Sequence, residues 1–237
     1  VEAFRVDGQP VADDSYVRAW RQAQAEADRA IDRALAQDPG GTLFEGVVAR
    51  TLAEHLPAGT AVFLANSMSV RYAEYFWPAN DRAHPVYYSR GANGIDGTLS
   101  TAMGVAHGGA PTVLLTGDLA FLHDANGLLN AGRLRGSLTV LLINNDGGGI
   151  FEHLPIAGFE PPFETFFATP QQVDFSALCA AHGVPHEIVE TKSALAAALA
   201  GEMPGGVRVL EVRTDRKADV KRCRQILREA SGAVSVR

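Results

Sequence analysis

The sequence predicts an α/β fold, an open parallel sheet with helices on both faces. Short β-rich segments alternate with helical ones from about residue 61 to residue 230, which is the pattern of βαβ units. Two of the β-rich segments, TVLLT (112–116) and LTVLLI (138–143), are almost continuously apolar. Strands buried on both faces of a parallel sheet have this composition. With 237 residues, 46% of them hydrophobic, the chain is long enough for one substantial core.

The predicted elements follow one another in a regular order. The segment DPGG (38–41) separates the first helix from the second. We expect residues 1–40 to form a linker and a helix from a preceding domain, residues 41–230 to form the α/β domain, and residues 231–237 to form a disordered tail. The expected strands are residues 61–65, 86–88, 112–116, 138–144, 187–189 and 207–212. The expected helices are residues 15–36, 43–55, 70–76, 97–106, 120–134, 194–201 and 216–230.

The composition excludes several classes of function. A net charge of −6 argues against a nucleic-acid surface, which depends on Lys and Arg to neutralise phosphates. No apolar run approaches the roughly 20 residues of a membrane span. Two cysteines, Cys179 and Cys223, make no disulfide framework, so we expect a cytoplasmic protein.

Polar residues that follow the predicted strands indicate a metal site. Asp118 and Asn145 are 27 positions apart, and a helix of about 16 residues followed by a strand would return the chain to the same sheet edge. A carboxylate and an amide oxygen suit Mg²⁺, which takes its remaining ligands from phosphates and water. The carbonyl of Gly147 could add a third protein ligand. Gly117 lets the chain turn tightly, and the N–H groups of the helix that starts near Leu119 favour phosphate oxygens at the same place.

These motifs carry a family resemblance. Gly117-Asp118, the crossover and Asn144-Asn145 resemble the signature of thiamine diphosphate enzymes. Leu119, in place of the usual glycine, and three further blocks resemble the 2-succinyl-5-enolpyruvyl-6-hydroxy-3-cyclohexene-1-carboxylate synthase family of menaquinone biosynthesis. The resemblance covers about residues 40–215 and implies the C-terminal, diphosphate-binding portion and its pyrophosphate-domain fold. The three blocks are residues 66–71, 89–97 and 144–151.

The resemblance implies a role for each matching residue. The cofactors would be thiamine diphosphate and Mg²⁺ (or Mn²⁺), with Asp118, Asn145 and Gly147 as the metal ligands. Arg71 and Arg90 would bind substrate carboxylates, for which Arg offers a bidentate fork. The remaining implied site residues are Ser67, Met68, Asn93, Ile95, Gly117, Asp118 and Leu119 around the cofactor, with Ile95 as the apolar wedge beneath it, and Ile150 and Phe151 lining the reacting pocket.

The resemblance also implies the reaction and the partners. The family is a transferase that decarboxylates 2-oxoglutarate and adds the succinic semialdehyde carbanion to isochorismate. In such enzymes a glutamate from a pyrimidine-binding domain, of the same or a neighbouring subunit, engages the cofactor ring. The assembly would be a homodimer or homotetramer. We therefore expect this chain to be an incomplete, C-terminal fragment that is inactive alone.

Two questions stay open at this point. The chain could instead be the diphosphate-binding half of another 2-oxo acid decarboxylase or carboligase, or a non-catalytic module that binds Mg²⁺–diphosphate. Arg71 and Arg90 favour the synthase that uses 2-oxoglutarate and isochorismate over another carboligase, because a neutral aldehyde acceptor needs no such pair. The segment 155–170, with four Phe and four Pro, could be a lid over the site or part of an interface.

Overall fold

The computed structural model describes residues 15–37 and 43–234. The predicted linker (1–14), the segment 38–41 and the end of the predicted tail (235–237) lie outside these residues. The chain divides into two compact units. The described part of the first comprises helix α1 (Ser15–Ala36), as predicted, and the end of helix α8 (Arg216–Ala233) from Gln225 onward. The second unit carries the sheet and runs to Arg224.

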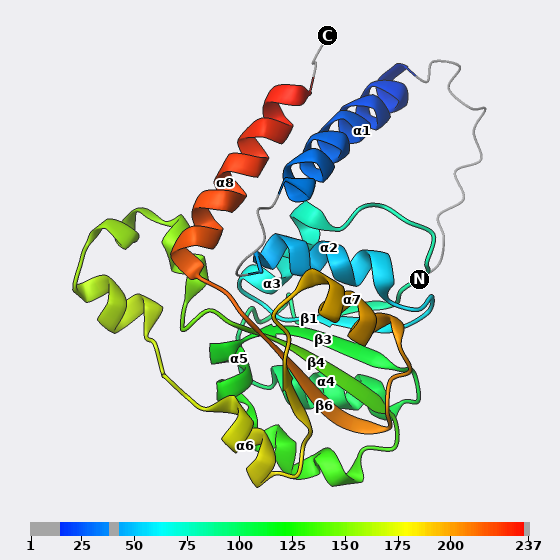
Figure 1. The fold of residues 1–237 in the computed structure, drawn as a ribbon, viewed down its shortest axis with the longest axis vertical. Coiled ribbons are helices and arrows are strands. Elements are labelled where there is room, and N and C mark those ends of the chain that lie inside the picture. Colours follow the sequence, from blue (N-terminus) through cyan, green and yellow to red (C-terminus); the bar gives the residue numbers. More distant parts are fainter. Residues whose placement is uncertain (1–14, 38–42, 235–237) are drawn as a thin grey trace. The chain divides into compact units, whose positions relative to one another are not determined.

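The second unit is built on a six-stranded sheet in which all neighbouring strands run parallel (Figure 1). The strand order is β2-β1-β3-β4-β6-β5. Because β3 and β4 are adjacent and parallel, the residues that follow them lie at the same edge of the sheet. The predicted fold class is confirmed. The strands are β1 (Ala61–Leu64), β2 (Val86–Tyr88), β3 (Thr112–Gly117), β4 (Ser137–Asn144), β5 (His186–Ile188) and β6 (Gly206–Arg213).

Helices cover both faces of this sheet (Figure 1). Helices α2, α3 and α7 lie on one face, and α4 and α6 lie on the other. The α-helices of this unit before α8 are α2 (Glu45–His55), α3 (Met68–Phe76), α4 (Thr98–His107), α5 (Asp118–His123), α6 (Phe175–Ala181) and α7 (Lys192–Ala200). Short 3₁₀ and π segments are η1 (Ala125–Arg133), η2 (Gly149–His153), η3 (Pro155–Gly158) and η4 (Glu164–Ala168).

The central strands are buried because they are packed on both sides. In β4, Val140 and Leu142 pack into one cluster with Leu99 and Met103 of α4 and Cys179 of α6. The intervening residues of the strand are also buried. The near-continuous apolar runs therefore reflect helices on both faces, as the sequence predicts.

The structure corrects the predicted crossover between β3 and β4. A single helix over 120–134 is wrong, because α5 ends at His123 and the chain continues as the 3₁₀ segment η1. The break lies at Asp124, whose carboxylate accepts hydrogen bonds from the N–H (2.5 Å) and Oγ (2.9 Å) of Ser100 at the start of α4. The crossover still brings Asn145 back to the edge where Asp118 lies.

Two other differences concern helices. The sequence reading missed α6, whose N-cap Asp174 accepts the N–H of Ala177 at 2.9 Å. Helix α8 continues to Ala233, so residues 231–233 of the predicted disordered tail are helical. None of the described helices is both long and apolar enough to span a bilayer.

Candidate functional site

The loops that follow strands β1 to β4 enclose a cavity of about 410 Å³. This is where open parallel sheets bind ligands, beyond the carboxyl ends of the strands. All thirteen site residues predicted from the sequence line this one cavity: Ser67, Met68, Arg71, Arg90, Asn93, Ile95, Gly117, Asp118, Leu119, Asn145, Gly147, Ile150 and Phe151.

Asp118 presents a buried carboxylate to this cavity. Its side chain accepts the N–H of Leu119 at 2.7 Å and the N–H of Gly147 at 2.8 Å. The second bond ties the start of α5 to the loop after β4. Burial raises the pKa of Asp118 to about 6, although these two hydrogen bonds oppose the shift. A nearby cation would compensate the buried negative charge.

Asn145 lines the same cavity as Asp118, and the oxygen of its carboxamide is unpaired. Its Nδ2 donates to Glu45 Oε1 at 2.8 Å, whereas its Oδ1 is buried and has no hydrogen-bond partner. Among the described side chains, His84 Nε2 is the other buried atom in this condition. Such atoms are rare in native structures and call for an explanation.

Gly147 has a backbone that no other residue would adopt easily. Its φ is +130°, and a Cβ built on it would lie 2.1 Å from the carbonyl oxygen of Ala168. The carbonyl of Gly147 accepts the N–H of Gly149 at 2.9 Å, and it retains a second lone pair. The glycine therefore permits the tight approach of the segment near Ala168 to the cavity loop.

The backbone at Gly117 does not require glycine. Its φ of −84° and ψ of 166° suit any residue, so the turn itself does not require glycine. A Cβ at this position would meet no atom within 4 Å. Because Gly117 lines the cavity, the missing side chain leaves space for a ligand.

These residues fit a divalent cation held together with a diphosphate. Asp118 and Asn145 offer oxygen atoms, and the unpaired Oδ1 of Asn145 is an available ligand. The described residues contain no group of three or more His, Cys, Asp or Glu side chains that could hold a metal by themselves. Mg²⁺ suits such a sparse set, because it commonly takes one or two protein ligands and completes its shell with phosphates and water.

The loop after β1 supplies hydrogen-bond acceptors to the two predicted substrate-binding arginines, Arg71 on α3 and Arg90 after β2. Asn66 is buried, and its Nδ2 donates to the carbonyls of Ser89 (3.0 Å) and Gly94 (2.6 Å). Its Oδ1 accepts Arg90 Nη1 at 2.8 Å. Arg71 Nη1 donates to the carbonyl of Ser67. Asn66 thus fastens the glycine-rich loop 89–97 and the guanidinium of Arg90 at the cavity.

Two residues that line the cavity have strained backbone conformations. Ser67 has a φ of +70° and Asn93 a φ of +34°, although neither is glycine. Both residues line the cavity. Positive φ in residues with a side chain costs about 1–3 kcal/mol and is concentrated at functional sites.

Ile150 and Phe151 line the cavity, and Phe151 connects it to the segment 155–170. The ring of Phe151 meets that of Phe167 edge-on, with centroids 5.5 Å apart. Phe163 in the same segment is fully buried, whereas Phe166 is 73% exposed. The segment thus has an inner side that touches the site and an outer side that faces solvent, and it extends away from the strands in Figure 1.

Arg216, at the start of α8, holds this region to the body of the second unit. It donates to the carbonyl of Asp146 (2.7 Å) and to Glu152 Oε1 (3.1 Å), and it pairs with Glu164 of η4. The cavity loop and η4 therefore share one anchor.

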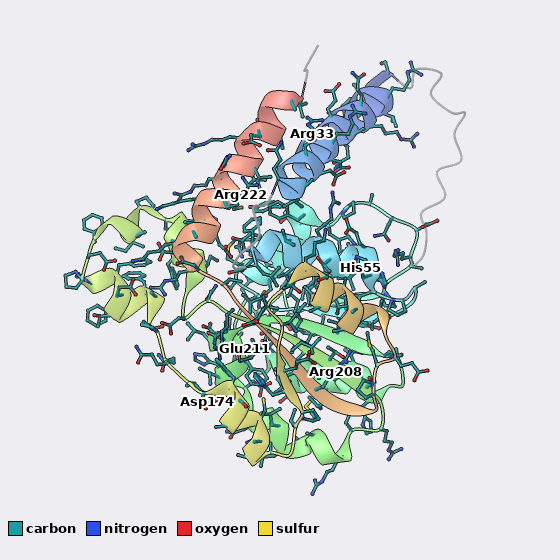
Figure 2. The ribbon with its side chains drawn as sticks, viewed as in Figure 1. Arg33, His55, Asp174, Arg208, Glu211 and Arg222 are labelled. Atoms are coloured by element: carbon teal, nitrogen blue, oxygen red, sulfur yellow. The ribbon has the colours of Figure 1, made fainter. Side chains whose placement is uncertain are left out.

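A second buried network supports the end of β4. Glu211 of β6, labelled in Figure 2, is 1% exposed. Its carboxylate contacts Asn144 Nδ2 (2.8 Å), Arg213 Nε (2.8 Å) and His186 Nε2 (2.7 Å). Burial alone would raise the pKa of Glu211, but these three hydrogen bonds outweigh it and lower the pKa. Glu211 thereby fixes Asn144, the residue next to Asn145.

Sequence reasoning gave no role in the site to Glu45 or Asn66. Glu45 is the first residue of α2 and is only 6% exposed. An acidic residue there usually favours the helix dipole, so the sequence gives no signal that it lines the cavity. Burial raises the pKa of Glu45, and the negative charge of Asp118 adds to this effect. Asn66 had one signal, since it directly follows the predicted strand 61–65.

Comparisons with known proteins agree with the geometry. Residues 65–212 match the family described as "Thiamine pyrophosphate enzyme, C-terminal TPP binding domain". A 2-succinyl-5-enolpyruvyl-6-hydroxy-3-cyclohexene-1-carboxylate synthase of Synechococcus sp. (strain JA-3-3Ab) is 57% identical over 92% of this chain and 36% of its own length. The synthase of that name from Synechococcus elongatus is 48% identical over 99% of this chain and 40% of its own. The chain thus spans well under half the length of these relatives.

Solved structures show the same fold. Benzoylformate decarboxylase from Polynucleobacter necessarius superposes with a TM-score of 0.61 at 21% identity, over 76% of this chain and 34% of that one. A thiamin diphosphate-dependent enzyme from Mycobacterium smegmatis, described as putative, gives 0.58 at 20% identity, over 75% and 33%. The family match covers more than half of the sequence and includes most of the cavity. The chain belongs to the family of C-terminal TPP-binding domains of thiamine pyrophosphate enzymes.

Proposed function

We propose that this chain binds thiamine diphosphate through Mg²⁺, with Asp118 Oδ, Asn145 Oδ1 and the carbonyl of Gly147 as the protein ligands. The observation that carries the proposal is the buried, unpaired Oδ1 of Asn145 in the cavity that also contains Asp118. Mn²⁺ would serve as a substitute, since it also accepts oxygen ligands. Ser67, Met68, Asn93, Gly117 and Leu119 would surround the cofactor, with Ile95 as the wedge beneath it.

We further propose that the full-length protein decarboxylates 2-oxoglutarate and adds the four-carbon fragment to isochorismate, in menaquinone biosynthesis. The names and the 57% and 48% identities of the two synthases support this substrate pair. When bound, thiamine diphosphate would supply the electron sink for the decarboxylation. This chain would orient the substrates, since Arg71 and Arg90 supply cations for carboxylates, and Ile150 and Phe151 keep an apolar wall beside them.

The arginines favour this reaction over that of another carboligase on the same cofactor. Both substrates carry carboxylates, and Arg71 and Arg90 line the same cavity. Each guanidinium has five N–H groups, so one hydrogen bond to Asn66 or to the Ser67 carbonyl leaves further donors for a substrate.

Arg90→Lys in the full-length protein tests the substrate proposal. Lysine keeps the charge but loses the planar fork, so we expect a higher KM for 2-oxoglutarate or for isochorismate. Arg133→Lys is the matched control, because Arg133 is exposed and does not line the cavity. Wild-type kinetic constants for both substrates in Arg90→Lys would show that Arg90 only braces the loop.

The 237-residue chain alone should not turn over. The acidic residues that line its cavity are Glu45 and Asp118, and both lie at the proposed metal end. We propose that the glutamate that engages the cofactor ring comes from a pyrimidine-binding domain, of the same or a neighbouring subunit in a homodimer or homotetramer. Carbon dioxide release from 2-oxoglutarate at about 1 s⁻¹ or faster by the chain alone would contradict this.

A further inference from the structure

We infer that Glu45 is a positioning residue: it sets the orientation of the Asn145 carboxamide so that Oδ1 is the atom offered to a metal. The inference rests on the proposed function and extends it to a residue outside the predicted ligand set. Glu45 lies 100 positions before Asn145, on a helix at the other end of the domain sequence.

Glu45 Oε1 accepts a hydrogen bond from Asn145 Nδ2, 2.8 Å away, so the carboxamide turns its NH₂ group toward Glu45. The carboxamide is planar, so fixing Nδ2 also fixes Oδ1, which is left buried and unpaired. Without Glu45 the amide could rotate by half a turn and present its NH₂ to the cation, which would repel it.

Glu45 is itself held in place by hydrogen bonds. Its backbone N–H donates to Asp219 Oδ2 at 3.2 Å, and the hydroxyl of Thr214 lies 3.4 Å from the same Oε1 that Asn145 contacts. The backbone N–H of Thr214 donates to the carbonyl of Asn144 at 3.0 Å. Segments from α2, from the end of β6 and from α8 thus converge on this contact. A residue held in this way can fix another side chain.

Packing alone does not account for a carboxyl group at position 45. Glu45 is 6% exposed and Asp219, beside it, is also 6% exposed. Burying a carboxylate is costly, and an apolar side chain of similar volume is often neutral or stabilising in such a place. If Glu45 positions the carboxamide of Asn145, a hydrogen-bond acceptor is required at position 45.

Three variants of the 237-residue chain separate the roles. Glu45→Met keeps the volume and removes the acceptor. Glu45→Gln keeps a carbonyl that can accept from Asn145 Nδ2. Glu54→Met is the matched control, since Glu54 lies on the same helix, is 41% exposed and does not line the cavity.

The measurement is the affinity for Mn²⁺ in the presence of thiamine diphosphate, followed by the electron paramagnetic resonance signal of free Mn²⁺. We expect Glu45→Met to bind Mn²⁺ about 10–100-fold more weakly, as expected when the partner of a metal ligand is lost. Glu45→Gln should recover most of the affinity, and Glu54→Met should match the wild type. Glu45→Met should unfold at the wild-type temperature or above it.

A mutant cycle shows whether Glu45 acts through Asn145. In an Asn145→Ala background, Glu45→Met should cost little further Mn²⁺ affinity, because the group it orients is gone. By NMR without metal, the Asn145 side-chain amide protons should lose protection from exchange in Glu45→Met and keep it in Glu45→Gln.

The contrary results are distinct. Unchanged Mn²⁺ affinity in Glu45→Met, or full additivity in the cycle, overturns the inference and leaves the proposed function standing. Loss of Mn²⁺ affinity that only parallels a lower unfolding temperature also overturns it, because the role is then structural. If the wild-type chain binds no Mn²⁺ with thiamine diphosphate, the proposed function fails and the inference fails with it.

Discussion

At the scale of single residues, the site contains a buried carboxylate and a buried amide oxygen whose interactions within the chain are incomplete. Asp118 is buried, with a pKa raised to about 6, and Asn145 Oδ1 has no partner. Protein interiors avoid both conditions unless a ligand resolves them. A divalent cation bound between these residues would compensate the carboxylate and satisfy the amide oxygen together.

Replacing Asp118 by Ala tests this at its strongest point. We expect thiamine diphosphate to lose its Mg²⁺-dependent binding, with an affinity at least about 10–100-fold weaker, since even losses beyond the direct ligands have that size. The fold should persist, because removing the buried carboxylate also removes its desolvation cost. Isothermal titration of the variant gives the affinity, and circular dichroism gives the fold.

Asp81→Ala is the control for this experiment. Asp81 is exposed and does not line the cavity, so its replacement should leave both readouts at wild-type values. If Asp118→Ala bound the cofactor as the wild type does, Asp118 would not be a metal ligand.

At the scale of elements, the sequence predicts the strands well and the connections less well. The apolar runs of β3 and β4 predict that these strands are buried, as they are. Their parallel pairing brings Asp118 and Asn145 to the same edge of the sheet, as expected. The break between α5 and η1 was not predictable, because it depends on Asp124 meeting Ser100 of another helix. The position of Glu45 in the site was not predictable for the same reason, since its partner Asn145 lies 100 residues away in the sequence.

The loop after β4 gives a prediction about conformation. Gly147→Ala should lower the free energy of unfolding by about 1–3 kcal/mol or more, because it adds strain at positive φ. The new Cβ would also meet the carbonyl oxygen of Ala168, which lies 2.1 Å from its ideal position. Urea denaturation followed by fluorescence measures the change.

Gly132→Ala is the matched control for the loop. A Cβ at Gly132 meets nothing within 4 Å, and Gly132 is exposed in η1. Its stability should stay near the wild-type value or rise slightly. Equal stabilities for the two variants would mean that the loop adjusts freely and that glycine is not required at position 147.

At the scale of the whole molecule, a buried charge network joins three strands below the site. Glu211 on β6 contacts Arg213, Asn144 of β4 and His186 of β5. Its folded-state pKa lies below the ordinary value of 4.5, because these hydrogen bonds outweigh burial. A lowered pKa means that the ionised network stabilises the fold above about pH 4.5 and that this contribution is lost as the pH falls through the folded-state pKa.

Glu211→Gln should therefore change the pH profile of stability. At pH 7 we expect a loss of about 2 kcal/mol in the free energy of unfolding, the size of a charged hydrogen bond. Carboxyl groups titrate between about pH 5 and pH 3. Over this range the variant should lose less stability than the wild type, because Gln has no proton to take up. Glu187→Gln, at an exposed position of β5, is the control. Parallel profiles for wild type and Glu211→Gln would contradict the network's role.

The family match, the cavity at the strand ends and the unpaired Asn145 oxygen lead to one central claim, that this chain binds thiamine diphosphate through a divalent cation. The most direct measurement is calorimetric titration of thiamine diphosphate into the purified chain, once with Mg²⁺ and once with a chelator. We predict a saturable heat with Mg²⁺ and none with the chelator. Equal affinity in both titrations, or no saturable heat in either, would contradict the claim.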